Sequence, residues 1–116
     1  MPLSIYIIHY TKLTERKVMQ CQQLKMFKGN VHFITKFDPE VISNSQYEML
    51  IKDKGCSINT LSSHLKHLCA LRLIKKNETD YCLILEDDIY FSDDFFTQLD
   101  LYIKEATKNK YDVLFL

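Results

Sequence analysis

Short apolar runs alternate with amphipathic helical segments along this chain, and that alternation limits the folds that are open to it. The order read from the sequence is strand, helix, strand, a weak helix, helix, strand, helix, strand. Runs of β-branched and aromatic residues indicate the strands, and apolar residues at steps of three and four indicate the helices. Alternation of this kind predicts an α/β fold, with a mostly parallel, Rossmann-like sheet and helices on both faces.

The boundaries of these elements come from local signals. Gly29 and Asn30 are expected to end the first helix, and Ser92 is expected to be the N-cap of the last one. The predicted strands are residues 4–10, 30–37, 80–85 and 111–116, and the predicted helices are 11–28, 45–52 (weak), 57–76 and 92–108. The apolar face of the helix at 57–76 is predicted to consist of Ile58, Leu61, Leu65, Leu68 and Leu71.

Length and charge exclude several classes of protein. The 116 residues fit one domain, and 15 basic side chains balance 15 acidic ones, so no basic field supports nucleic-acid binding. No apolar run approaches the ~18 residues that a membrane span requires. The last predicted strand looks buried although domains usually end at the surface, so residues 1–116 are expected to be the N-terminal part of a longer fold.

The cysteines and the N-terminus bear on location. The four cysteines have no metal-binding spacing and are expected to be reduced. The first ten residues lack the charged segment and cleavage site of a signal peptide. We therefore expect a cytoplasmic protein.

Three acids, Glu86, Asp87 and Asp88, follow directly after the apolar run at 81–85. Ligands of open parallel sheets bind beyond the carboxyl ends of the strands, where these acids are expected. Clustered carboxylates need compensating positive charge, and Mg²⁺ or Mn²⁺ suits their oxygens and also bridges to phosphate. The triplet therefore indicates a nucleotide-sugar site. The competing interpretation is a solvated turn between strand and loop.

The second acidic pair, Asp93 and Asp94, has a different prediction. It follows the expected N-cap Ser92, where negative charge interacts favourably with the helix dipole. We therefore expect a structural role for this pair. The stretch also lacks the central glycine and the ligand spacing of an EF-hand.

Motifs along the whole chain carry a family resemblance. They are IYIIHYTKLTERK at residues 5–17, LSSHLKH at 61–67 and LILEDD at 83–88, and YDVLFL at 111–116 continues the series. In this order they resemble the N-terminal part of glycosyltransferase family 25, which includes lipopolysaccharide and collagen-type galactosyltransferases.

The resemblance implies a GT-A-type fold that binds a UDP-sugar donor, with Mn²⁺ or Mg²⁺ as cofactor. Glu86 and Asp88 would match the outer acids of the metal-binding Asp-x-Asp motif. Asp88 would face metal and diphosphate, and Glu86 or Asp87 would face the ribose or the sugar.

Further donor-site candidates lie at the end of the first strand. His9 is close to the expected donor pocket, Tyr10 is suited to stack on uracil, and Arg16 corresponds to the family's Glu-Arg position and is suited to reach a phosphate. The alternatives are a structural histidine and a solvated helix residue. For His64 and His67 a capping or packing role is favoured over metal binding, because no carboxylate is near them in the sequence.

The predicted function is transfer of a hexose, galactose or glucose, from a UDP-sugar to a glycan or lipopolysaccharide acceptor. No residue is identified as the catalytic base. The alternative is a truncated or non-catalytic nucleotide-sugar-binding module. A signalling receiver domain is disfavoured, because its first strand should end in acids rather than in His9 and Tyr10.

Overall fold

The computed structural model describes residues 3–42, 55–77 and 81–116. Three strands form a parallel sheet in the order β2-β1-β3: β1 (Leu3–Ile8), β2 (Asn30–Ile34) and β3 (Tyr81–Glu86). The other elements are α1 (Thr14–Gln23), the short 3₁₀ helix η1 (Pro39–Val41), α3 (Ile58–Asn77) and α4 (Phe95–Asn109). The predicted α/β fold with parallel strands is confirmed.

Strand β1 lies between the other two because its side chains are apolar on both faces. Ile5, Tyr6 and Ile7 are completely buried, and strands of a parallel sheet that are covered on both faces have such continuous apolar runs. In the register of the sheet, Ile8 aligns with Ile34 of β2 and with Glu86 of β3. The carboxyl ends of all three strands therefore meet at one edge.

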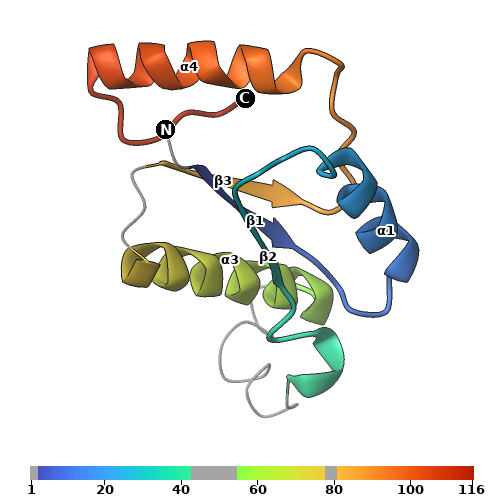
Figure 1. Ribbon diagram of the computed structural model, residues 1–116. Coiled ribbons are helices and arrows are strands. Elements are labelled where there is room, and N and C mark those ends of the chain that lie inside the picture. The colour runs from blue at the N-terminus through green and yellow to red at the C-terminus, as the bar shows by residue number, and fades with distance from the viewer. Residues whose placement is uncertain (1–2, 43–54, 78–80) are drawn as a thin grey trace.

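Helices cover both faces of this sheet (Figure 1). On one face Ile5 and Ile7 pack with Leu24, which follows α1, and with Phe96 of α4. On the other face Tyr6 packs with residues of β2, β3 and α3; the apolar partners there include Ile34, Ile84, Ala70 and Leu73. Complete burial of one such aliphatic side chain contributes about 1.5–3 kcal/mol. The two clusters therefore hold α1, α3 and α4 to the sheet.

The predicted apolar face of α3 is wrong in part. Leu61 is buried, but Leu68 and Leu71 are 42% and 52% exposed. The buried residues of α3 are instead Leu61, Ser62, Lys66 and Ala70. Leucines are distributed around much of this helix, and the small side chains of Ser62 and Ala70 allow it to approach the sheet closely.

The predicted fourth strand at residues 111–116 is also wrong. These residues form no strand, and Val113 and Phe115 are 70% and 93% exposed. Lys110 adopts a left-handed conformation at the end of α4, and the residues after it do not pair with β3. An apolar pattern does not make a strand without a partner for its backbone groups.

Smaller differences concern the helix ends. Asp94, rather than Ser92, is the N-cap of α4, and the Ser92 hydroxyl donates a hydrogen bond to Asp94 (2.9 Å). Helix α1 ends at Gln23, before the predicted stop at Gly29. The weak helix predicted at 45–52 lies outside the described residues. Among the helices that the structure describes, none combines the length and the apolar character needed to cross a membrane.

Candidate functional site

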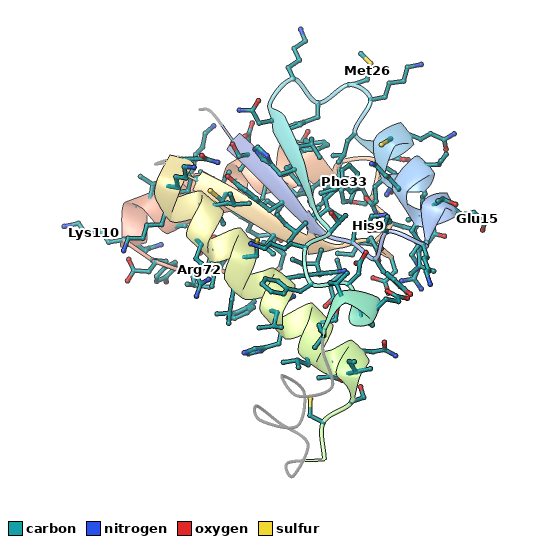
Figure 2. All side chains as sticks on the ribbon, turned by 90° about the horizontal axis from the view of Figure 1, so that it is seen from below. His9, Glu15, Met26, Phe33, Arg72 and Lys110 are labelled. Carbon is teal, nitrogen blue, oxygen red and sulfur yellow. The ribbon has the colours of Figure 1, made fainter. Side chains whose placement is uncertain are left out.

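A pocket lies at the edge of the sheet where the strands end, with a volume of about 270 Å³. We call it the strand-end pocket. It brings together all the site residues predicted from the sequence: His9, Tyr10, Arg16, Glu86, Asp87 and Asp88. Figure 2 shows His9 at the end of β1, and Glu15 of α1 on the outside of the molecule. The sequence therefore identified residues that share one pocket, although they come from distant parts of the chain.

Asp87 points into the protein rather than into solvent. Its residue is 6% exposed. One carboxylate oxygen contacts Nδ1 of His9 at 2.8 Å, and the other accepts a hydrogen bond from Arg16 at 3.2 Å. A buried carboxylate needs such partners. Asp87 therefore joins β1, α1 and β3 at the wall of the pocket, and its predicted contact with the donor stays a prediction.

Glu86 and Asp88 are exposed on either side of the buried Asp87. The Glu86 side chain is 61% exposed. Alternating exposure is expected at a strand end, where successive side chains point in opposite directions. Two of the three acids are therefore accessible to a ligand.

Two carboxylates are enough for a site in which the cation also binds phosphate oxygens. Mg²⁺ in such sites takes one or two carboxylates and completes its coordination with substrate phosphates and waters. Within residues 3–42, 55–77 and 81–116, no group of three or more potential His, Cys, Asp or Glu ligands is placed to hold a metal. Cation binding at Glu86 and Asp88 therefore requires oxygens from a ligand.

Helix α1 holds the loop that follows the acids. Gln20 is completely buried, and its side-chain amide donates to the carbonyl oxygens of Asp87 (3.0 Å) and Ile89 (2.9 Å). Gln23 donates to the same Ile89 carbonyl (2.9 Å) and accepts from the amide of Phe91 (2.7 Å). The loop at residues 87–91, which we call the acidic loop, is thus fixed by two glutamines, and no pattern in the sequence marks either of them.

Lys66 is a buried cation at the back of the pocket, with 2% of its residue surface exposed. Its Nζ donates to the carbonyl oxygen of His9 (2.7 Å) and to Asp38 (2.5 Å). It therefore joins α3 to the end of β1 and to the turn before η1. No sequence pattern reveals Lys66, because it is a charged residue within a leucine-rich helix and its partners are far away along the chain.

The charge of Asp38 is stabilised by these contacts. Burial by itself raises the pKa of Asp38, but hydrogen bonds from Lys66 and Thr11 and the positive charge of Lys66 outweigh it. The pKa of Asp38 is therefore lowered below its ordinary value, and the residue remains a carboxylate.

Tyr10 and Arg16 form part of the rim. The Tyr10 hydroxyl donates to Glu40 of η1, and Nζ of Lys66 lies 5.6 Å from the centre of the Tyr10 ring. The Arg16 side chain is 46% exposed although it contacts Asp87. Part of this guanidinium is therefore available to an anion in the pocket.

A second, shallow and open hollow continues along the first turns of α3, and we call it the α3 groove. Its lining residues are Asn59, Thr60, Ser63, His64 and His67. Asn59 and Ser63 also line the strand-end pocket, so the two hollows are adjacent. Nε2 of His67 lies 3.9 Å from Glu86.

The predicted packing role is wrong for His64, and neither histidine caps the helix. His64 is exposed, and the side chain of His67 is 40% exposed. The hydrogen bond that caps the helix comes instead from Ser57, whose hydroxyl accepts from the amide of Thr60 (3.1 Å). The carboxylate that the local sequence lacks is supplied to His67 by β3.

Comparison with known proteins identifies one family. The model of the family described as "Glycosyltransferase family 25 (LPS biosynthesis protein)" matches residues 3–115. The match includes both walls of the strand-end pocket. No curated protein and no solved structure matches the chain significantly.

Proposed function

The chain belongs to glycosyltransferase family 25, a family of lipopolysaccharide biosynthesis, and from this premise we propose that its strand-end pocket binds a UDP-hexose together with Mn²⁺ or Mg²⁺. The proposed reaction is transfer of galactose or glucose to a glycan or lipopolysaccharide acceptor. We also propose a GT-A-type arrangement and a cytoplasmic location.

The observation that carries this proposal is the division of the acidic triplet. Asp87 is buried against His9 and Arg16, whereas Glu86 and Asp88 are exposed at the pocket. A simple solvated turn would not require Asp87 to be buried, because burying a charged group costs free energy unless partners compensate it. The buried network fixes the backbone between the two exposed acids. That arrangement supports a cation-binding site better than it supports a simple turn.

The residues around this cation-binding site suit a nucleoside diphosphate. Glu86 and Asp88 would hold the cation, which when bound neutralises negative charge on the departing diphosphate. The exposed part of the Arg16 guanidinium is suited to donate hydrogen bonds to phosphate oxygens. Tyr10 offers a ring to the uracil from the rim.

The size of the pocket limits what it holds. Its volume of about 270 Å³ is below the range of about 300–1,000 Å³ that is usual for small-molecule sites. We therefore assign the diphosphate and its cation to the strand-end pocket, and the remaining parts of the donor to adjoining surfaces.

A second candidate function is binding of a nucleotide sugar without transfer. Among the residues that line the strand-end pocket, the only acids are Glu86, Asp87 and Asp88. Asp94, farther along the chain, serves α4 instead: Gln98 donates to the Asp94 side chain (3.3 Å) and to its carbonyl oxygen (2.9 Å). With Asp87 paired and with Glu86 and Asp88 assigned to the cation, no carboxylate among the pocket-lining residues is left as a base for an acceptor hydroxyl. This observation favours a module that binds the donor.

Calorimetry tests the binding proposal that both functions share. Mn²⁺ and UDP are titrated separately and then each in the presence of the other. We expect each to strengthen binding of the other, because the diphosphate supplies ligands that the acids lack. Asp88→Ala should remove this coupling, and the matched control Asp93→Ala, an exposed acid outside the pocket, should retain it. Equal affinity with and without the second ligand would contradict a bridging cation.

Transfer itself is tested with labelled UDP-galactose and UDP-glucose over a panel of saccharide acceptors. Product that appears with the unmodified chain and disappears with Asp88→Ala supports the transferase. Binding without product supports the binding module.

A further inference from the structure

The α3 groove (Asn59, Thr60, Ser63, His64 and His67) is lined by polar side chains without a single carboxylate, lysine or arginine. We propose that this groove binds a neutral sugar ring through its hydroxyl groups. The proposal rests on the proposed function of the adjoining strand-end pocket, and it extends the site along α3 to the sugar that is transferred or accepted.

The chemistry of the lining favours a sugar over an ion. An amide and hydroxyls both donate and accept hydrogen bonds, and a neutral imidazole does so through its two nitrogens. Sugar hydroxyls have the same dual capacity. A phosphate would be recognised by arginine or lysine, and a hard cation by carboxylates. The groove offers neither of these.

Helical spacing arranges three of these groups in a row. Asn59, Ser63 and His67 are separated by four residues each, so they lie on one face of α3. With a rise of 1.5 Å per residue the row extends about 12 Å along the helix axis. A row of this length is longer than one pyranose ring and offers successive contacts to adjacent hydroxyls.

The fold itself makes little use of these side chains. Thr60 shares a hydrogen bond with the Ser57 hydroxyl (2.9 Å). Among the described residues, the side chains of Asn59, Ser63 and His64 have no hydrogen-bond partner in the protein. Their hydrogen-bonding capacity is therefore available to a ligand.

The groove also begins where the proposed diphosphate site ends. Asn59 and Ser63 line both hollows. His67 lies at 3.9 Å from Glu86, one of the two exposed acids. A sugar that is attached to the diphosphate, or that approaches it for transfer, would therefore extend over α3. The same hydroxyl chemistry belongs to the donor hexose and to the acceptor sugar, so the experiment separates these two sources.

The test is an NMR titration of the ¹⁵N-labelled 116-residue chain in Mg²⁺. UDP, UDP-galactose, and lactose in the presence of UDP are added in separate series. UDP should shift amide resonances around Arg16 and Asp88. Additional shifts at Ser63, His64 and His67 with UDP-galactose would assign the groove to the donor hexose, and the same shifts with lactose would assign it to the acceptor. Either result supports the proposal.

Variants make the test specific. His64→Ala and His67→Ala should each weaken sugar binding about 3- to 10-fold, which is the effect of one net hydrogen bond. UDP affinity of His64→Ala should not change. The matched control is Arg72→Ala, an exposed residue farther along α3 and away from His9 (Figure 2), which should leave sugar affinity unchanged.

The outcomes separate this inference from the proposed function. If UDP shifts amide resonances at the strand-end pocket but no sugar shifts those on α3, the sugar-binding proposal for the α3 groove is overturned and the proposed function is unaffected. If a sugar shifts resonances on α3 but UDP has no effect, sugar binding in the α3 groove is supported and the proposed donor site is contradicted. Binding of Zn²⁺ at His64 and His67 with no response to either sugar would make the groove a metal site and overturn the proposal.

Discussion

The ammonium group of Lys66 donates a hydrogen bond of 2.7 Å to the carbonyl oxygen of His9, from a position where the lysine is 2% exposed. The same Nζ contacts Asp38, so one buried cation ties α3 to the end of β1 and to the turn before η1. The shape of the strand-end pocket depends on this connection.

Replacing Lys66 by methionine should destabilise the protein. Lys66→Met removes the cation from the Asp38 carboxylate, which keeps its hydrogen bond from Thr11, and leaves the His9 carbonyl without its Lys66 donor. A polar group that loses a buried partner costs about 1–3 kcal/mol, and a charged one costs more. Urea unfolding measures the change in the free energy of unfolding. The exposed control Lys75→Met should stay within about 0.5 kcal/mol of the unmodified chain. If the unpaired charge of Asp38 causes the loss of stability, the Lys66→Met/Asp38→Asn variant should be more stable than Lys66→Met. A double variant that is no more stable would argue against that cause.

Asp38 should make stability dependent on pH in the acid range. Its pKa is lowered in the folded state, by Lys66 and Thr11 against the opposing effect of burial. The unfolded chain therefore binds a proton at higher pH than the folded one does, and the contribution is complete above the ordinary aspartate pKa of about 3.9. It is lost as pH falls through the lowered value. Unfolding free energies between pH 6 and pH 2 should fall less steeply for Asp38→Asn, and an unchanged slope would contradict the assignment.

Asp87 and Asp88 should respond in opposite ways to the same substitution. Asp87→Asn weakens the contacts with His9 and Arg16 and should cost about 1–3 kcal/mol of unfolding free energy. Asp88→Asn changes an exposed side chain and should cost no more than about 0.5 kcal/mol, while it removes the mutual strengthening of Mn²⁺ and UDP. Urea unfolding and calorimetry on both variants give the comparison. Equal loss of stability in the two variants would show that the assignment of Asp87 as buried and Asp88 as exposed is wrong.

Gln20→Met should loosen the acidic loop. The substitution conserves length but removes two donated hydrogen bonds, to the carbonyl oxygens of Asp87 and Ile89. A buried group that loses its partner costs about 1–3 kcal/mol, so the unfolding free energy should fall by that amount. Amide hydrogen exchange at residues 87–91 should become faster. Gln22→Met, at an exposed position of the same helix, provides the control and should change neither quantity.

The sequence by itself determined the elements whose signals are local. The apolar runs at β1 and β3 and the periodicity of the helices predicted parallel strands, and the triplet at residues 86–88 lies at the strand end as expected. The same local reasoning was wrong at residues 111–116, because a strand also requires a partner for its backbone groups. It was wrong again for Leu68 and Leu71, because leucines occur on several sides of α3.

Only the tertiary structure decided which polar residues turn inward. His9 and Asp87 are 78 residues apart in the sequence, and Lys66 is 57 residues from the His9 carbonyl that it binds. Periodicity assigns charged and amide side chains to the solvent, so it could not distinguish Asp87 from Glu86 and Asp88, or find Gln20 and Lys66. A buried polar group is stable only when its partners are in place, and those partners come together only when β1, β3, α1 and α3 have packed.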